Sequence, residues 1–377
     1  MKKILALFLA LLMPALLLSG CEGTEGSKEA GTVPTVAKAQ KQKITDLVGR
    51  EVEIAVPVQK VVAIGPGALR LVTYAEGTSM VVGIEEIEKK ASPGRSYMMA
   101  YPDLKKLPSI GQGGPDTAPN EESLLGVKPD VIFVSILVDK AKADQLQAKT
   151  GIPVVVLSYG SVSGLTSFDE NLYRSLTMIG TIIGKEKRAQ DVVAYLRQNE
   201  TDLVERIKDV PAAEKATVYV GAVSAKGAHG IEYTQAKYPP FTFIGAKNVV
   251  DETGKSGTVM IDKEKLISWD PDILFLDEGG YALVTEDYKN NPAFYQSLSA
   301  VKKGQVYSQI PYNNYTTNID TAFADAYYAG KIIFPEQFQD IDPIKKSDEI
   351  YQFLLGKPLY ADMVRDFGGF KKLELGK

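Results

Sequence analysis

The sequence predicts an α/β protein of two similar lobes, each with a central, mainly parallel sheet, bridged by a single long helix. The first observation is a repeated unit of helix, turn, Pro-Asp and apolar strand, EESLLGVKPDVIFVS over residues 121–135 and KEKLISWDPDILFLD over 263–277. A further helix and strand follow each copy in the same order. Between the copies lies a charged stretch without glycine or proline. We expect a ligand cleft between the lobes.

The repeated unit is interpreted as an internal duplication, because the order and spacing of its parts agree. Pro129 aligns with Pro271, and QLQAKTGIPVVVLS follows the first copy as FYQSLSAVKKGQVYSQI follows the second. Chance similarity is the alternative, since helix–turn–strand units look alike in many α/β proteins.

The stretch between the copies, KEKRAQDVVAYLRQNETDLVERIKD, lies between Gly184 and Pro211. Its apolar residues recur at helical spacing, which predicts one helix of roughly 37 Å. We therefore divide the folded chain into an N-terminal lobe over 44–184, an interdomain helix over 185–210 and a C-terminal lobe over 211–377.

Length and composition bound the class of protein. A chain of 377 residues, 45% hydrophobic and 24% charged, is long enough for two globular domains. The net charge of -4 gives no indication of a nucleic-acid partner, and we expect a monomer.

The first 21 residues, MKKILALFLALLMPALLLSGC, combine a basic start, an apolar run and small residues, as in a secretory signal. Their end resembles a lipobox, in which cleavage precedes a lipid-modified Cys21. The apolar run is shorter than the ~20 residues of a membrane-spanning helix, and no later segment is expected to span. Residues 22–43 are then a polar tether. We expect an extracytoplasmic protein, anchored by lipid to the cell membrane and without a disulfide, since Cys21 is the only cysteine.

The N-terminal lobe is expected to open with a hairpin-like pair from Ile44, followed by strands that alternate with helices. Gly65-Pro66-Gly67 opens a helix after the first parallel strand, and a buried helix ends at Gly184. The expected parallel strands are residues 61–64, 80–84, 131–134 and 154–157.

The C-terminal lobe repeats this pattern. Asn318 is expected to cap one late helix, and Asp342-Pro343 to start another. The expected strands are 217–222, 248–250, 273–276 and 305–308, so both lobes are predicted to be Rossmann-like.

Several segments together resemble the substrate-binding lipoproteins of ABC importers. They are the lipobox, ITDLVGREVEI, VVAIGPGALR, KPDVIF, the helix after GKEKRA and the tail AGKIIFPEQFQDIDPIKKSDEIYQFLLG. The resemblance is to the iron-siderophore, haem and cobalamin class, in which one long helix joins two α/β lobes. It covers nearly the whole mature chain and is specific as a combination. It implies a permease dimer with ATPase subunits as the partner.

The bound solute is constrained by the scarcity of metal ligands. A bare transition-metal ion needs several imidazole, thiolate or carboxylate ligands, but the chain has one histidine, His229, in a loop. We therefore expect no protein-held metal and no cofactor. The leading expectation is a chelated iron complex, such as a siderophore or haem, or another chelate such as cobalamin; the alternative is an oxyanion such as molybdate or tungstate.

Candidate ligand-binding residues follow the strands, where open α/β sheets bind ligands. Arginine suits anionic oxygens because its fork donates two parallel hydrogen bonds. Arg70 has an alternative, a pairing with an acid on its own helix. The candidates are Arg70, Arg95, Tyr97 and Gln112 from the N-terminal lobe, and Tyr233, Asn314 and Tyr315 from the C-terminal lobe.

No catalytic residue is predicted. Gly254-Lys255-Ser256 resembles the end of a phosphate loop, but Val249 stands where that loop needs glycine. GSVSG over 160–164 has Val162 where a nucleophile elbow needs serine. A secreted enzyme on a two-lobed scaffold remains a second alternative.

The duplication also selects two acids. Glu122 lies seven residues before Pro129, and Glu264 lies seven before Pro271. In the resembled family, an acid on each lobe docks against arginines of the two-fold permease, so we expect these two glutamates to dock. Ordinary solvated glutamates are the alternative, and the neighbouring Glu121 leaves the register open.

Overall fold

The computed structural model describes residues 40–376 apart from 91–92, 115–116, 136–138, 160–169 and 226. The signal sequence, Cys21, most of the tether and the GSVSG segment lie outside the described residues. Residues from Ala39 onward form one compact unit. Within the described part of the chain, no helix is both long and apolar enough to cross a membrane.

The fold begins earlier than expected, at β1 (Gln40–Thr45), which pairs antiparallel with β2 (Glu51–Val56). Lys43 donates to Glu51 at 2.6 Å across this pair, and Lys41 also pairs with Glu53. Residues 40–43, predicted as tether, therefore belong to a strand, because opposite charges face each other across the register.

The sheet of the N-terminal lobe is parallel throughout, in the order β4-β3-β5-β6. Its strands are β3 (Val61–Ile64), β4 (Val81–Gly83), β5 (Val131–Val134) and β6 (Val154–Val156). The helices of this lobe are α1 (Ala68–Tyr74), η1 (Thr78–Met80), α2 (Glu86–Lys89), α3 (Ser96–Ala100), η2 (Pro102–Lys106), α4 (Glu121–Val127), α5 (Lys140–Thr150) and α6 (Glu170–Ile183).

The C-terminal lobe has a second parallel sheet, in the order β12-β11-β7-β9. These strands are β7 (Thr217–Gly221), β9 (Lys247–Asn248), β11 (Ile273–Asp277) and β12 (Val306–Gln309). The predicted α/β fold with two parallel sheets is confirmed. An antiparallel pair that the sequence did not indicate, β8 (Tyr233–Ala236) with β10 (Gly257–Met260), covers this sheet.

The helices after the long helix are mostly short, and α13 and α14 are the longest of them. They are η3 (Ala212–Glu214), α8 (Pro239–Phe243), η4 (Val249–Thr253), α9 (Lys263–Trp269), α10 (Tyr281–Asn290), α11 (Pro292–Ser297), α12 (Ser299–Lys302), α13 (Ile319–Ile333), α14 (Pro343–Leu355) and α15 (Tyr360–Phe367).

In both Pro-Asp turns, the aspartate accepts hydrogen bonds at the start of a neighbouring strand. The carboxylate of Asp130 accepts hydrogen bonds from the backbone N–H groups of Gln59 and Lys60, at 2.7 and 2.8 Å, just before β3. Asp272 accepts from the N–H and hydroxyl of Thr217, at 2.8 and 2.7 Å, at the start of β7. Each turn therefore fixes the neighbouring strand of its own sheet.

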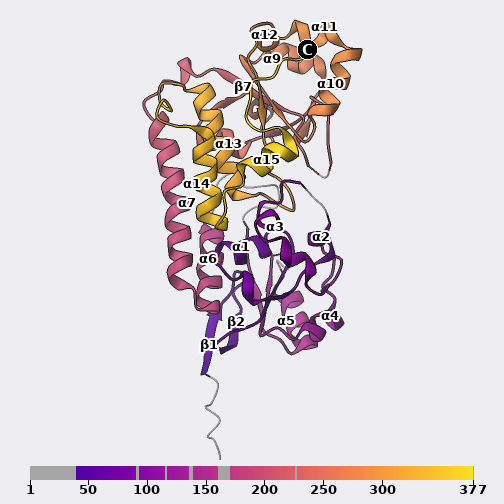
Figure 1. Ribbon diagram of the computed structural model, residues 1–377, viewed down its shortest axis with the longest axis vertical. Helices are drawn as coiled ribbons and strands as arrows, with labels where there is room; N and C mark the ends of the chain where they lie inside the picture. The colour runs from indigo at the N-terminus through magenta and orange to yellow at the C-terminus, as the bar shows by residue number, and fades with distance from the viewer. Residues whose placement is uncertain are drawn as a thin grey trace, which may run out of the picture. The chain divides into compact units, whose positions relative to one another are not determined.

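The long helix α7 (Glu186–Ile207) contacts both lobes (Figure 1). Near its start, Arg188 donates to the backbone oxygen of Tyr74 at 2.9 Å. Near its end, Arg206 donates to Asp340 at 2.7 Å. The C-terminal part of the chain also contacts the N-terminal lobe: Lys357, just after α14, donates to the backbone oxygen of Ala100. The lobes are therefore joined by covalent continuity and by side chains at both ends of α7.

Candidate functional site

The carboxyl ends of the N-terminal strands gather polar groups around α1. Gly65 follows β3, Glu85 follows β4 and Tyr159 follows β6. The Gly65 N–H donates to the Glu85 carboxylate at 3.0 Å. The strand ends of one parallel sheet lie at one edge, and from this edge Tyr159 contacts Arg70 on the first turn of α1.

Arg70 is fully buried, and none of its hydrogen-bonding or ion-pair partners among the described residues is an acid. One terminal nitrogen donates to the Tyr159 hydroxyl at 3.0 Å and to the backbone oxygen of Thr317 at 2.8 Å. The other donates to the backbone oxygen of Asn314 at 3.0 Å, while Nε has no partner among the described residues. Helix α1 contains no acid, so the alternative of a pairing on its own helix is wrong.

Arg95 is also buried, but its charge is balanced. It donates to Glu88 at 2.9 Å and to the side-chain oxygen of Asn314 at 3.2 Å. The Tyr97 hydroxyl donates to the same Glu88 at 2.7 Å, and the Tyr97 ring lies 4.7 Å from the Arg70 guanidinium. Burial raises the pKa of Glu88, against the opposing influence of Arg95.

A loop of the C-terminal lobe, residues 310–318, inserts against this edge of the N-terminal lobe. Tyr315 and Thr316 have φ angles of 54° and 68°, a strained region for residues other than glycine. The Tyr315 hydroxyl donates to Glu85 at 2.9 Å. A Cβ at Gly67 would lie 2.8 Å from the methyl of Thr316, so glycine permits this close contact. The two lobes touch directly around Arg70.

Glu85 is the titratable group at this contact. Burial raises its pKa to about 7, although hydrogen bonds from Gly65 and Tyr315 favour the carboxylate. Its position two residues after β4 was the signal that sequence reasoning overlooked, and Tyr159, three residues after β6, gave a similar signal.

Five of the seven predicted ligand-binding residues are brought together: Arg70, Arg95, Tyr97, Asn314 and Tyr315. Gln112 is nearby through its backbone oxygen, which accepts from the N–H of Ile87 at 3.0 Å, but its side chain is exposed.

Tyr233 differs from these five, because it lies on strand β8 and not in a cleft loop. Its ring stacks at 3.9 Å on His229, and no contact joins it to either arginine among the described residues. His229 itself lies 2.9 Å from the backbone oxygen of Ala225. Asn318 occupies the N-cap position of α13, but its side chain does not cap the helix and instead donates to Gly94, at 2.8 Å.

A family model described as periplasmic binding protein matches residues 85–311, more than half of the chain. The chain belongs to this family. Its members are the substrate-binding proteins of transporters rather than enzymes.

Relatives of this periplasmic binding protein bind different solutes. The molybdate-binding protein MolA of Haemophilus influenzae is 26% identical over 327 residues, covering 82% of this chain and 89% of MolA. The Fe(3+)-citrate-binding protein YfmC of Bacillus subtilis is 26% identical over 313 residues, covering 81% and 89%. A periplasmic solute-binding protein of Veillonella parvula shares the fold, with a TM-score of 0.69 at 20% identity over 87% of this chain and 97% of its own.

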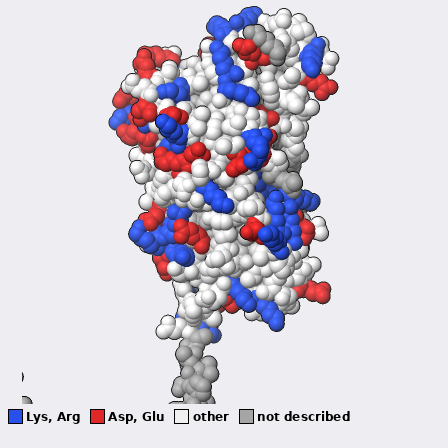
Figure 2. Space-filling model, viewed as in Figure 1, with Lys and Arg blue, Asp and Glu red and all other residues white. Residues whose placement is uncertain are grey.

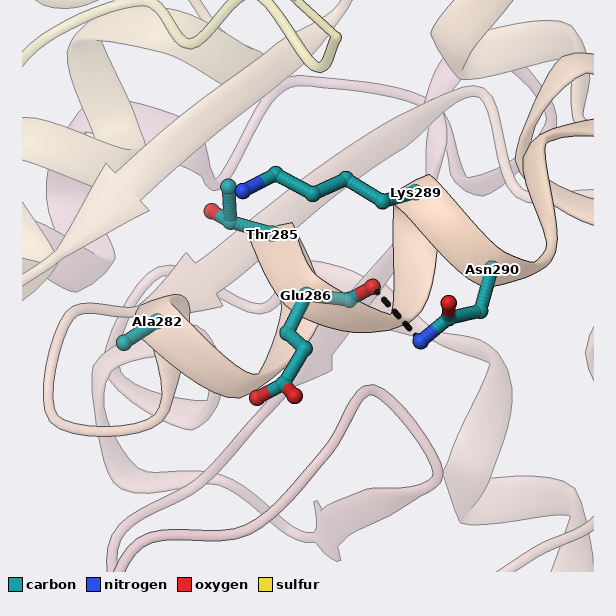
Figure 3. A pocket seen from close by; sticks show the side chains of 5 residues that line it. All are labelled: Ala282, Thr285, Glu286, Lys289 and Asn290. Atoms are coloured by element: carbon teal, nitrogen blue, oxygen red, sulfur yellow. Dashed lines mark hydrogen bonds between the residues drawn. The ribbon is translucent and has the colours of Figure 1, made fainter.

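One surface hollow of the binding protein lies on α10 and is lined by neither of the two arginines (Figure 3). This hollow of about 570 Å³ is lined by one helix alone, through Ala282, Thr285, Glu286, Lys289 and Asn290. A smaller hollow of about 190 Å³ lies beside Arg95 and is lined by both lobes, with Lys90 and Lys105 on one side and Asp362 and Arg365 of α15 on the other. The second hollow fits a ligand site better, since it touches a buried arginine and both lobes.

Charges of both signs are interspersed over the face seen in Figure 2, so this face gives no indication of the charge of the ligand. Within the described ranges, no group of three or more His, Cys, Asp or Glu side chains is placed to hold a metal ion. The ligand chemistry must therefore be inferred from the buried groups between the lobes.

The strand ends of the C-terminal lobe carry acids that sequence reasoning missed. Asp277 ends β11, Glu278 follows it, and Asp325 faces them from α13. Burial raises the pKa of Asp277 to about 6 and that of Glu278 to about 8, and that of Asp325 well above its usual value. These acids directly follow or face a correctly predicted strand, which was the available signal.

Proposed function

We propose that this protein is the extracytoplasmic solute receptor of an ABC importer and binds a compact anion between its lobes. The observation that carries the proposal is Arg70, a fully buried guanidinium that forms no ion pair or hydrogen bond with a carboxylate among the described residues. A buried charge without a directly paired counter-charge is costly, and an anionic ligand would supply one. Arg95 is the second contact and is weaker for this purpose, since Glu88 already pairs with it.

The size of the ligand follows from the contact between the lobes. The backbone carbonyl oxygens of Asn314 and Thr317 in one lobe already accept hydrogen bonds from Arg70 of the other. The hollow beside Arg95, about 190 Å³, is smaller than the roughly 300–1,000 Å³ of common small-molecule pockets. We therefore favour an oxyanion of the molybdate or tungstate kind over the bulky chelates that the sequence put first. A compact iron chelate, such as ferric citrate, is the second candidate.

Binding would exchange one set of oxygens for another. Arg70 now donates to carbonyl oxygens, and a charged oxygen makes a stronger hydrogen bond than a neutral one. An entering anion would compete for the same guanidinium and align it through parallel N–H groups. The ligand leaves chemically unchanged, because the proposal includes no catalytic step.

To deliver its solute to the permease, the protein must be held at the membrane. Lipid on Cys21 anchors it outside the cytoplasm, and the permease dimer with its ATPase subunits receives the solute. Glu122 and Glu264 are proposed to dock on that permease. Cys21→Ala should release the protein while leaving residues 40–376 folded, and an absence of lipid on the wild-type protein by mass spectrometry would contradict the anchor.

The ligand is tested by native mass spectrometry of protein purified from its own host, with elemental analysis. Calorimetry then compares molybdate, tungstate and ferric citrate on the wild type and on Arg70→Gln. We expect one anion to bind tightly to the wild type and poorly to the variant. A neutral or cationic ligand, or equal affinity of both proteins, would overturn the proposal.

A further inference from the structure

Helices α4 and α9 are the two copies of one surface feature. Each has seven residues and begins after a side-chain cap, Asn120 in α4 and Asp262 in α9. Each ends at a residue in the left-handed conformation, Lys128 with φ 49° or Asp270 with φ 39°. The two helices therefore present equivalent positions to solvent.

The first two positions of these helices differ in whether their charged side chains are paired. Glu121, at the first position of α4, pairs with Lys149 at 2.9 Å. The first position of α9, Lys263, pairs with Asp287 at 2.7 Å. The second position is Glu122 in one copy and Glu264 in the other, both exposed and without a hydrogen-bond or ion-pair partner among the described residues.

A second match lies one turn further along. Leu125 is 46% exposed and Ile267 is 43% exposed, and each stands three residues after the unpaired glutamate. Residues three apart are neighbours on a helix surface, so acid and apolar side chain share one patch. The preceding residues, Leu124 and Leu266, are both fully buried and make the contact with the core.

Folding alone does not require these two exposed side chains. A single exposed aliphatic residue is ordinary and needs no explanation. Here the same exposure occurs at the same place in both lobes, each time beside an unpaired acid. Other aliphatic residues of similar exposure, such as Val204 at 51% and Ile344 at 48%, have no such counterpart.

We propose that Leu125 and Ile267 are apolar docking contacts, each forming with its neighbouring glutamate one half of a duplicated surface that binds the two halves of the permease. This inference rests on the proposed function. The repetition fits a partner that offers one basic and apolar patch twice. The unpaired acids require positive charge on that partner, and the aliphatic side chains require apolar surface beside it.

The two kinds of side chain have separable roles. Charges at the rim of an interface mainly speed encounter and respond to salt, whereas buried apolar contacts mainly slow dissociation. Loss of Leu125 and Ile267 should therefore change the dissociation rate and leave the association rate and its salt dependence nearly unchanged. Loss of the glutamates should do the reverse.

The first experiment locates the contact in host cells. A photoreactive phenylalanine analogue replaces Leu125, Ile267, Val204 or Ile344, one at a time, in the full-length lipoprotein. We expect cross-links from positions 125 and 267 to a permease subunit identified by mass spectrometry, and none from 204 and 344. Equal cross-linking at all four positions, or cross-linking only at 204 and 344, would overturn the inference.

The second experiment measures rates on the permease and ATPase complex of the same host, held in lipid nanodiscs. The double variant Leu125→Ser with Ile267→Ser should dissociate about tenfold faster, while Val204→Ser with Ile344→Ser behaves as the wild type. Circular dichroism and ligand calorimetry check that each variant folds. An unchanged dissociation rate of the first variant would show that the two residues have no docking role. Failure of the wild type itself to bind any permease would instead refute the proposed function.

Discussion

The two lobes have the same framework but different chemistry at their strand ends. In the N-terminal lobe, the edge of the sheet holds the buried cations Arg70 and Arg95 together with the acids Glu85 and Glu88. In the C-terminal lobe, the corresponding edge holds the acids Asp277, Glu278 and Asp325, with no buried arginine among the described residues. The Pro-Asp turns and capped helices are alike because the backbone needs them in both lobes. The residues at the strand ends can differ between the lobes, because their side chains take no part in the backbone hydrogen bonds that hold each sheet together.

The difference also concerns how buried charge is handled. Glu88 of the N-terminal lobe is paired with Arg95 and Tyr97. Among the described residues, the Glu278 carboxylate is met by the N–H of Gly369 and by a Lys371 ammonium 3.7 Å away, and burial raises its pKa to about 8. Glu278 thus takes up a proton near neutrality. An anion is therefore expected to be held chiefly by the N-terminal lobe.

The strongest test of this asymmetry is removal of Arg70. Arg70→Gln should weaken binding of the identified anion by about 2–4 kcal/mol, as for one partner of a buried charge pair. Arg95→Gln should cost less, because Glu88 already balances that guanidinium. Calorimetry measures both, with Arg197→Gln on the exposed side of α7 as control. A larger loss on Asp277→Asn than on Arg70→Gln would reverse the comparison.

Stability should fall as the pH rises, because of the C-terminal acids. The folded pKa values of Glu278, about 8, and Asp277, about 6, lie above those of the unfolded chain, so folding favours the protonated forms. Their stabilisation is complete below the unfolded pKa values and is lost as pH passes through the folded ones. We expect a decrease in the free energy of unfolding of about 1–3 kcal/mol between about pH 5 and pH 9.

Urea unfolding at several pH values measures that decrease, and Glu278→Gln should reduce it while Asp103→Asn, an exposed acid of the N-terminal lobe, should not. A wild-type protein that grows more stable over this pH range would show that these acids are ionised when folded.

The shared framework is tested by the two turn aspartates. Asp130→Ala and Asp272→Ala should each lower the free energy of unfolding by about 1–2 kcal/mol, since each removes two hydrogen bonds to a charged acceptor near the surface. Denaturant titration of both variants gives the values. A difference of more than about 1.5 kcal/mol between them would mean that the turns are not equivalent.

The smallest expected effect is on the contact between the two lobes at Tyr315 and Glu85. Tyr315→Phe removes the hydrogen bond to Glu85 and should shift the ligand-free equilibrium toward separated lobes by about 1 kcal/mol. Because burial raises the pKa of Glu85 to about 7, closure should weaken as the pH rises through that value. Single-molecule fluorescence between dyes at 142 and 289, on a Cys21→Ser background, measures the populations. An identical distribution in both proteins would remove this contact from lobe closure.

The sequence by itself determined the secondary structure that repeats. The duplicated Pro-Asp unit, the parallel strands and the uninterrupted helix α7 (Glu186–Ile207) follow from local pattern and spacing, which depend on neighbours within a few residues. Local pattern also misled at some places. Asn318 has the residue type of a cap but binds Gly94 instead, and Tyr233 is in a strand that pairs with a segment about 25 residues later.

Only the tertiary structure decided which polar groups meet. Arg70 and Arg95 look equivalent in sequence, yet Glu88 neutralises one and backbone oxygens from 244 and 247 residues away surround the other. Glu85 and Tyr315 are separated by 230 residues and still form a hydrogen bond. The physical reason is that a buried charge depends on everything packed around it, and the partners here come from opposite lobes. Tertiary structure likewise distinguishes Glu121, which pairs with Lys149, from Glu122, which has no ion-pair partner among the described residues.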